Sequence, residues 1–348
     1  MKTFQPARER GFADTLVRPS EADSLGCLPR SPSGFALGNR ARSVDKRSTH
    51  PASLADFPNQ SKSSVRCFNF DLGATLSSGQ VFRWWQLRPG VFAGWIGADL
   101  AQISQQGSQL SFQGTNVQAV ERFFSLDQDL PAIARDIDVD PIIHEALRRH
   151  WGVRLIRQDP WECLAGFILS SFNNIVRLTG MLNGLAERFG EPAALPLGSG
   201  DSQTHSPILR YRFPRARRLA RVSERALRNC GLGFRAPYLK GAAQAMADGS
   251  ADLERWRPLE DEALRRRLLT IPGVGEKVVE CVMLFSFGRE SAFPVDVWIG
   301  RAMRAWYFKH RRVTDRQIRE FALKHFGPHC GWAQQVLYCQ ARSLKQGR

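Results

Sequence analysis

The chain has 348 residues and carries a formal net charge of +16 at pH 7. A chain this basic is expected to bind a polyanion, and nucleic acid is the natural partner. No apolar run approaches the roughly 18 residues that a membrane-spanning helix needs, so we expect no membrane partner.

Residues 1–62 differ in composition from the rest of the chain. They are rich in Ser, Pro, Arg and Gly and show little hydrophobic periodicity, so we predict a disordered leader that buries too little apolar surface to fold. Glu9, Asp14, Glu21 and Asp23 argue against a mitochondrial transit peptide, and an apolar secretory core is missing. We therefore expect an intracellular protein, in the cytoplasm or nucleoid of a bacterium or in the nucleus of a eukaryote.

Residues 63–140 are predicted to form a first domain around an antiparallel sheet. Short runs of aromatic and branched residues alternate with turn signals such as Arg88-Pro89-Gly90. We expect the strands at Val81–Leu87, Val91–Ile96, Leu100–Ser104 and Gln109–Phe112. This punctuation predicts a meander.

Residues 141–348 are predicted to form a second, mostly helical domain, since the pattern after Val117 is helical almost to the end of the chain. Helix starts are indicated at Asp159-Pro160 and at Thr314, where Gln317 completes a capping box. One short helical stretch is expected to carry a run of arginines whose only acidic neighbour is Glu224, and which either contacts phosphates or forms a solvated face. These arginines are Arg210, Arg212, Arg215, Arg217, Arg218, Arg221, Arg225 and Arg228.

The segment from Leu268 to Asp296 reads LLTIPGVGEKVVECVMLFSFGRESAFPVD. Gly273 and Gly275 permit a tight turn with positive φ, whose bare N–H groups can contact a phosphate at a helix N-terminus. Lys277 follows on the first helical turn, where the helix dipole and partial burial favour a neutral, nucleophilic amine. Asp296 completes a lysine and carboxylate pair. Taken alone, the pattern is also that of an ordinary turn with a solvated lysine.

Together with motifs elsewhere, this segment resembles the helix-hairpin-helix DNA glycosylases, and in particular the 8-oxoguanine DNA glycosylase and AP lyase of the eukaryotic type. Ser77–Trp84 resembles the N-terminal signature of that family, Arg157–Met181 its central helices and Gly331–Tyr338 its last helix. The matching blocks span residues 66–343 in the order of the family, and their agreement is more specific than any single motif. The resemblance implies an α+β fold, in which a TBP-like antiparallel sheet precedes a mostly α-helical helix-hairpin-helix domain.

The resemblance also implies the reaction. Lys277 would attack the sugar C1′, expel 8-oxoguanine or a related oxidised purine from duplex DNA, and leave a Schiff base through which β-elimination cuts the strand. Asp296 would stabilise the positive charge that develops on the sugar. It is also expected to cap the helix that begins at Val297, and this structural role alone is the alternative reading. The implied function is a bifunctional glycosylase and lyase of base excision repair.

Recognition of the damaged base follows from the same resemblance. The backbone carbonyl of Gly79 would accept a hydrogen bond from the N7–H that 8-oxoguanine has and guanine lacks. Gln334 would read the Watson–Crick edge, while Tyr338 and Cys281 would sandwich the base. For Tyr338 and Cys281, each considered alone, an ordinary place in a helix core is the alternative.

The strand opposite the lesion would be contacted by Arg177 and Arg235, which match the two arginines that hydrogen-bond the unpaired cytosine in the family. Phe234 matches the aromatic wedge beside the second arginine. Asn173 is expected at the same surface, but its neighbour Phe172 stands where the family usually has an asparagine. We therefore predict a weaker preference for cytosine, with the phenyl ring acting as a second wedge.

A second departure from the family pattern concerns the lesion-bearing strand. Trp298 replaces a histidine that contacts a phosphate in the family, and Ala341 replaces the aspartate that orients this histidine. Trp298 is expected to line the phosphate or the base pocket through its N–H group. The hairpin glycines Gly273 and Gly275 complete the predicted DNA contacts.

Metals and cofactors are not expected. The cysteines are scattered without the close pairs of a zinc site, and only Cys330 and Cys339 lie where the related endonuclease III group holds its iron–sulfur cluster. The full set is Cys27, Cys67, Cys163, Cys230, Cys281, Cys330 and Cys339. We expect a monomer that binds double-stranded DNA containing 8-oxoguanine opposite cytosine.

Two other functions are weighed against this one. An alkyladenine glycosylase would share the architecture, but that group lacks the hairpin lysine, so Lys277 argues against it. A non-catalytic DNA-binding module would keep the hairpin and the arginines, yet it would have no reason to hold Lys277 and Asp296 together.

Overall fold

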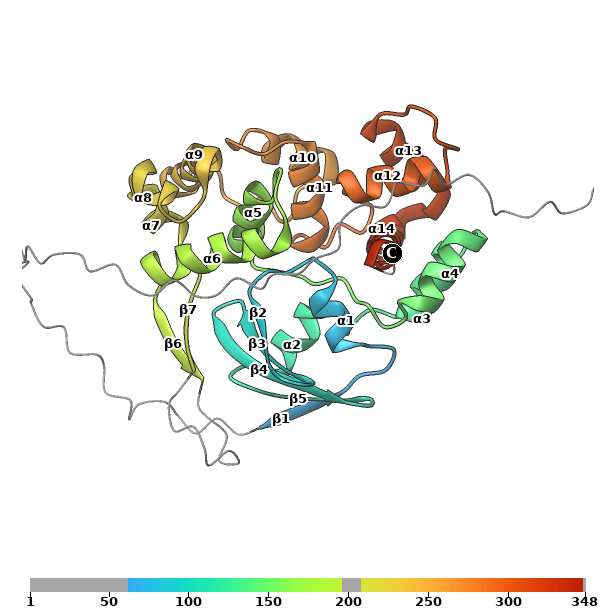
Figure 1. Ribbon diagram of the computed structural model, residues 1–348, viewed down its shortest axis with the longest axis horizontal. Helices are drawn as coiled ribbons and strands as arrows, with labels where there is room; N and C mark the ends of the chain where they lie inside the picture. The colour runs from blue at the N-terminus through green and yellow to red at the C-terminus, as the bar shows by residue number, and fades with distance from the viewer. Residues whose placement is uncertain (1–61, 196–207, 347–348) are drawn as a thin grey trace, which may run out of the picture. The chain divides into compact units, whose positions relative to one another are not determined.

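A computed structural model of the chain describes residues 62–195 and 208–346. The predicted leader, apart from its last residue, lies outside the described residues. The first part of the described chain is a five-stranded antiparallel sheet with the order β1-β5-β4-β3-β2 (Figure 1). Its strands are β1 Ser63–Arg66, β2 Trp84–Arg88, β3 Val91–Ile96, β4 Asp99–Gln106 and β5 Gln109–Gln113.

The predicted meander is confirmed for the last four strands, which follow one another through short turns. Gly90, Gly97 and Gly107 adopt positive φ in these turns, which glycine does without steric cost. The first of the four begins at Trp84 rather than at Val81. The side chain of Arg83 is only 3 % exposed and forms an ion pair with Glu162 at 2.9 Å, so the chain turns inward before the strand starts.

One face of the sheet packs on two helices, α1 Leu72–Ser77 and α2 Val117–Phe123, which Figure 1 shows beside it. Ile103, Leu110 and Phe112 from the strands are buried against Phe123 and its neighbours. The sequence did not predict α1, which begins where the Asp71 side chain accepts a hydrogen bond from the Ala74 N–H. This short helix leads directly into Gly79.

The rest of the described chain is mostly helical, as predicted. Its helices are α3 Leu130–Ile137, α4 Pro141–Arg149, α5 Pro160–Leu169, α6 Ile175–Phe189, α7 Ala216–Ala220, α8 Glu224–Arg228, α9 Ala236–Asp248, α10 Asp261–Leu269, α11 Glu276–Phe285, α12 Val297–Trp306, α13 Asp315–Phe326 and α14 Cys330–Gln346, with 3₁₀ turns at Gly233–Arg235 and Gly327–His329. Asp159 caps α5 and the Thr314–Gln317 capping box starts α13, so both predicted starts are confirmed.

The helical core is centred on α11, in which every residue from Val278 to Phe285 is buried. It packs against α5 and, with the large buried side chain of Trp332 from α14, belongs to one continuous apolar cluster. Both α3 and α4 also contribute to this cluster, and the predicted domain boundary after residue 140 falls between them. That boundary stays a prediction.

A two-stranded antiparallel sheet interrupts the helices, with β6 at Pro192–Leu195 and β7 at Ile208–Tyr211. The prediction that the arginine run forms one helical stretch is therefore wrong at its first residues. Arg210 lies in β7, where its guanidinium stacks 4.7 Å from the ring centre of Trp85, and Arg212 follows the strand. The remaining six arginines are divided between α7 and α8, because Ser223 caps a new helix after α7 has ended.

Candidate active site

The hairpin lies between α10 and α11, as predicted. Of its two glycines, Gly273 has the predicted positive φ and Gly275 does not. Gly273 has a φ of +81°, and a Cβ there would lie 2.5 Å from the Cβ of Tyr238, so no larger residue fits. Gly275 is instead extended, with φ −105° and ψ 177°, because it is the N-cap of α11. As a glycine, it has no side chain that could accept hydrogen bonds from the first N–H groups of α11. A phosphate oxygen would be a suitable acceptor for these groups.

Lys277 lies on the first turn of α11, half-buried against the end of α5. Its Nζ donates a hydrogen bond to the Oγ of Ser170 at 2.9 Å and lies 4.8 Å from the ring centre of Phe167. The sequence did not indicate either partner, because only the packing of α5 on α11 brings them together. The amine is thus held in one place by a hydroxyl and an aromatic face.

Asp296 is the N-cap of α12, as predicted, and its Oδ1 accepts the Ile299 N–H at 2.8 Å. Burial raises the pKa of Asp296, while the hydrogen bond from Ile299 and the positive charge of Lys277 act in the opposite direction. Among the described residues no direct ion pair joins Lys277 to Asp296, so the carboxylate acts on the amine across the site rather than by contact.

Cys281 follows Lys277 by one turn of α11 and is 2 % exposed. Burial raises the pKa of its thiol to about 12, although the charge of Lys277 lowers it. A thiol that stays protonated at neutral pH is a weak nucleophile and a small, polarisable packing surface. Cys281 therefore suits a contact with a flat base better than a chemical role.

The other residues predicted to read the base come together with Asp296. A Cβ on Gly79, whose φ is +84°, would lie 3.1 Å from the ring of Tyr338, so the glycine backbone closely approaches this ring. Burial raises the pKa of Tyr338 to about 12, the negative charge of Asp296 acts in the same direction, and the positive charge of Arg342 acts against it. The phenol therefore stays neutral beside the carboxylate.

Gln334 lies one turn before Tyr338 on α14 and is 4 % exposed. Its Nε2 donates to the carbonyl of Pro294 at 3.1 Å, two residues before Asp296. Its Oε1 is buried without a hydrogen-bond partner among the described residues. A buried acceptor left unsatisfied is costly in a folded protein, so this oxygen marks a place where a ligand donor would be stabilised.

The residues predicted to contact the opposite strand form a second group, joined to the first by the Ser170–Phe172 segment. Arg235 is 2 % exposed, and its Nε donates to the Ser171 carbonyl at 2.8 Å. Its Nη2 donates to the Phe172 carbonyl at 2.9 Å, and its guanidinium lies 4.3 Å from the ring centre of Phe234. One buried arginine thus fixes the backbone next to Ser170.

The apolar side chains of this second group point into solvent. Phe172 is 95 % exposed and has a φ of +50°, a conformation that is unfavourable for a bulky residue. Phe234 is 52 % exposed, and Val176, which the sequence did not single out, is 84 % exposed. Phe172 and Phe234 both adjoin the buried Arg235, and exposed aromatic rings at such a place indicate a binding surface.

The remaining predicted DNA contacts flank these groups. Arg177 is exposed on the first turn of α6. The pKa of Arg235 is lowered mainly by burial and, to a smaller extent, by the positive charge of Arg177. The amide of Asn173 donates to the Leu169 carbonyl at 3.1 Å and so secures the turn after α5. Trp298 lies on the first turn of α12, where its backbone N–H helps to lower the pKa of Asp296.

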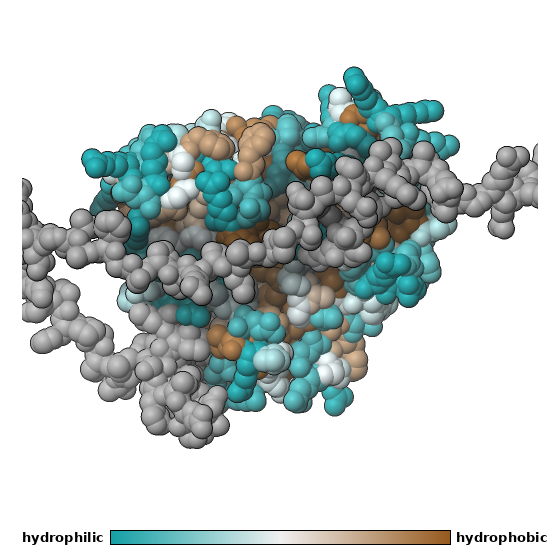
Figure 2. All heavy atoms as spheres, viewed as in Figure 1, coloured by the Kyte–Doolittle hydropathy of each residue, from teal (hydrophilic) through white to brown (hydrophobic). Residues whose placement is uncertain are grey.

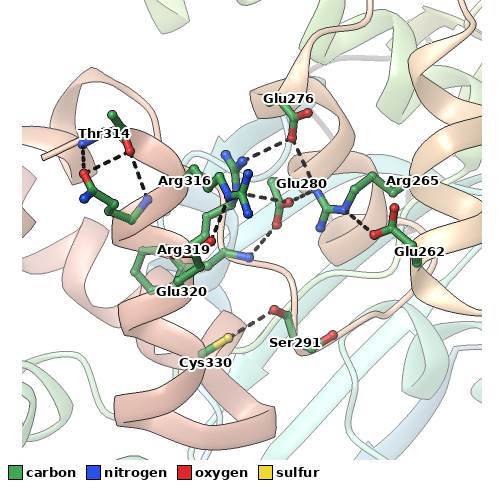
Figure 3. A network of polar contacts seen from close by, with 12 residues as sticks. Glu262, Arg265, Glu276, Glu280, Ser291, Thr314, Arg316, Arg319, Glu320 and Cys330 are labelled. Carbon is green, nitrogen blue, oxygen red and sulfur yellow. Dashed lines mark hydrogen bonds and ion pairs between the residues drawn. The ribbon is translucent and has the colours of Figure 1, made fainter.

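A buried carboxylate that the sequence analysis missed ties the catalytic elements together (Figure 3). Glu280 is 1 % exposed, lies between Arg265 of α10 and Arg319 of α13, and accepts the Phe293 N–H at 2.8 Å. Phe293 leads into Asp296, and Glu280 is on the same helix as Lys277. Its signal in the sequence is a single acid inside the apolar run of α11.

The segment before Asp296 is also tied to α14. The Gly331 N–H donates to the Glu290 carbonyl at 2.7 Å. The thiol of Cys330 donates to the Ser291 carbonyl at 3.2 Å, as Figure 3 shows. The helix that bears Gln334 and the turn that bears Asp296 therefore share one set of anchors. No group of acidic, Cys and His residues suited to a metal ion occurs in the described part of the chain, and no described helix is long and apolar enough to span a membrane.

Two family models and known proteins match this chain. Residues 64–164 match the family model for the N-terminal domain of 8-oxoguanine DNA glycosylase, and residues 165–328 match that of the HhH-GPD superfamily of base excision DNA repair proteins. The N-glycosylase/DNA lyase OGG1 of Arabidopsis thaliana is 31% identical over 287 residues, which cover 77% of this chain and 76% of that protein.

Two solved structures are also similar to this chain. The Clostridium acetobutylicum 8-oxoguanine glycosylase/lyase, solved with double-stranded DNA containing cytosine opposite 8-oxoguanine, is 30% identical with a TM-score of 0.74, over 83% of this chain and 99% of that one. MBOgg1, solved with a low-affinity DNA ligand, is 33% identical with a TM-score of 0.75, over 82% of this chain and 96% of that one.

Proposed function

Because the chain belongs to the 8-oxoguanine DNA glycosylase family, within the helix-hairpin-helix superfamily of base excision DNA repair proteins, we propose that Lys277 and Asp296 carry out its reaction. The protein is a bifunctional repair glycosylase that excises 8-oxoguanine from duplex DNA and cleaves the strand at the resulting abasic site.

The first step is displacement of the base. The enzyme extrudes the damaged nucleotide from the stack, and the lone pair of the Lys277 amine forms a bond to C1′. The glycosidic bond breaks, its electron pair leaves with the base, and the nitrogen passes one proton to the departing base. Asp296, which lies across the site, stabilises the positive charge that develops on the sugar.

The second step cuts the strand. The sugar ring opens to a Schiff base between Lys277 and C1′, which acidifies the hydrogen on C2′. Loss of this proton and departure of the 3′ phosphate complete a β-elimination. Ser170 supports both steps, since its hydroxyl holds the amine at a fixed position at the end of α5.

Recognition of the base uses the neighbouring residues. The unsatisfied Oε1 of Gln334 suits the N–H donors on the Watson–Crick edge of 8-oxoguanine. The Gly79 carbonyl would accept the N7–H that distinguishes this lesion from guanine. Tyr338 and the neutral thiol of Cys281 would cover the two faces of the ring.

The undamaged strand is assigned to the second group of residues. Arg235 and Arg177 would hydrogen-bond the cytosine left unpaired, and the exposed rings of Phe234 and Phe172 would fill the space vacated by the lesion. The hairpin glycines Gly273 and Gly275, with Trp298, would contact the backbone of the lesion strand. We further propose that one monomer performs all of these contacts.

The observation that carries the proposal is the position of the Lys277 amine, fixed by Ser170 and subject to the charge interaction with Asp296. Borohydride reduction on a duplex with 8-oxoguanine opposite cytosine should trap the protein covalently. Lys277→Gln should abolish the adduct, while Lys324→Gln, an exposed lysine on α13, should leave it unchanged. No adduct with the parent protein would refute the proposed chemistry.

A further inference from the structure

The helices α7 and α8 present a concentrated positive charge that the proposed reaction does not use. All six of their arginines are exposed, and we call them the arginine surface: Arg215, Arg217, Arg218, Arg221, Arg225 and Arg228. Of these six arginines, only Arg228 forms an ion pair with a described residue, Glu224, at 3.3 Å. Figure 2 shows hydrophilic residues over the region where Figure 1 places these helices.

The arginine surface has mixed effects on the two helices. Four of its arginines lie in last turns, where a cation complements the helix dipole, and one of them also pairs with Glu224. Arg215 occupies the N-cap position of α7, where it provides no side-chain cap and places a cation at the positive end of the helix dipole. Arg225 and Arg228 are three residues apart on α8, a spacing at which like charges repel. The helices are held instead by the fully buried Leu219 and Leu227, which pack with α9. Five of the six arginines have no ion pair among the described residues, so most of this positive charge is available to a polyanionic partner.

The position of the surface identifies this partner. Arg228 donates from Nη1 to the Gly233 carbonyl at 3.2 Å, directly before Phe234 and Arg235. These two residues also precede α9, on which α7 and α8 both pack. Further along α9, a Cβ on Gly241 would lie 2.8 Å from Pro272 of the hairpin. One helix thus joins the arginine surface to both groups of residues assigned to DNA.

We propose that the arginine surface binds the phosphates of the same duplex, beyond the lesion, on the side of the Phe234–Arg235 turn. This inference rests on the proposed function, because the arginine surface would bind the same duplex that carries the lesion. Guanidinium groups bind phosphates without reading sequence, so the contact contributes affinity and salt dependence but no discrimination between bases. It also makes binding depend on the length of duplex beyond the lesion.

The test compares two triple variants that lose the same charge. The surface variant loses half of the arginine surface through Arg217→Gln, Arg218→Gln and Arg221→Gln. The control variant loses exposed arginines of α4 and α13 through Arg148→Gln, Arg149→Gln and Arg316→Gln. Dissociation constants are measured by fluorescence anisotropy at several salt concentrations. The probe is a duplex with a tetrahydrofuran abasic analogue, either short or extended on both flanks.

We expect the surface variant to bind the extended duplex at least about tenfold more weakly and to lose about 0.9 from the salt slope for each phosphate contact removed. Its affinity for the short duplex and its excision rate at saturating enzyme should match those of the control variant. Equal behaviour of the two variants on both duplexes would overturn the inference. Failure of the proposed chemistry is seen separately, as absence of the borohydride adduct in the parent protein.

Discussion

The Nζ of Lys277 lies 2.9 Å from the Oγ of Ser170, so two helices hold the proposed nucleophile from two sides. Lys277 belongs to the first turn of α11, and Ser170 is the C-cap of α5. The next residue, Ser171, accepts a hydrogen bond from Arg235 through its carbonyl. Adjacent residues of one turn therefore connect the amine that attacks the lesion strand with the arginine assigned to the opposite strand.

Ser170→Ala should lower the single-turnover excision rate by about tenfold or more, because loss of a hydrogen bond to a charged or reactive group costs about 1.5–3 kcal/mol. The affinity for DNA should not change, since the hydroxyl positions the amine rather than the duplex. Ser171→Ala is the matched control, because the contact of Ser171 with Arg235 is made by its backbone carbonyl. A similar fall in both variants would show that the Ser170 hydroxyl has no specific part in positioning.

The rate of excision should show an acidic limb that Asp296 controls. Burial raises the pKa of this carboxyl, and the reaction needs the ionised form, so the rate should fall as pH drops through a value above the ordinary range of aspartate. Asp296→Asn should be much slower and should lack this limb. A single-turnover pH profile of both proteins measures the effect, and an unshifted limb in the variant would assign it to another group.

The same substitution has an expected effect on stability, which serves as the control for folding. A carboxyl whose pKa is raised in the native state binds its proton more tightly there than in the unfolded chain, so stability is lost as pH rises through the native pKa. Asparagine keeps the N-cap without burying a charge. The thermal stability of Asp296→Asn at neutral pH should therefore equal or exceed that of the parent protein.

Local signals in the sequence were sufficient for the framework. Asp159 and Thr314 each cap a helix through a contact with a residue three positions later, so the whole interaction lies within one short motif. The strands from Trp84 to Gln113 are separated by turns whose glycines need positive φ. Lys277 and Asp296 were found because the motif around them is contiguous and resembles one family.

What escaped prediction depends on contacts between distant segments. Ser170 has no distinguishing pattern until α5 packs on α11, and Glu280 looks like a surface acid until Arg265 and Arg319 enclose it. The predicted conformation of Gly275 was wrong because glycine occurs both in left-handed turns and as an extended N-cap. Side-chain type alone does not separate these two uses.

Phe172→Asn should increase the ratio of excision opposite cytosine to excision opposite adenine. The phenyl ring is 95 % exposed and has no hydrogen-bonding group, whereas an amide can contact the unpaired base. Asparagine also tolerates the φ of +50°, which costs other residues about 1–2 kcal/mol, so thermal stability should stay equal or rise. Phe172→Leu, which keeps an apolar wedge, should leave the ratio unchanged, and an unchanged ratio in Phe172→Asn would contradict the assigned role.

Glu280 should position Asp296 through the Phe293 N–H, and two substitutions separate this role from simple stability. Glu280→Gln leaves Arg265 and Arg319 facing a neutral amide, although both stay partly exposed and paired with Glu276. The loss of stability should therefore lie at the lower end of the range for a broken buried ion pair, about 3 kcal/mol, which urea denaturation measures. Glu280→Asp keeps the charge but shortens the side chain, so the hydrogen bond of 2.8 Å to Phe293 is lost while most of the stability remains.

We expect Glu280→Asp to lower the single-turnover rate about tenfold without weakening DNA binding, since a small displacement of a catalytic group is enough to cost this much. Glu276→Gln is the matched control, because Glu276 pairs with the same two arginines but is half exposed and has no bond to Phe293. Its stability should change by less than about 1 kcal/mol and its rate should not change. If Glu280→Asp excises as fast as this control, the carboxylate stabilises the fold and has no part in placing Asp296.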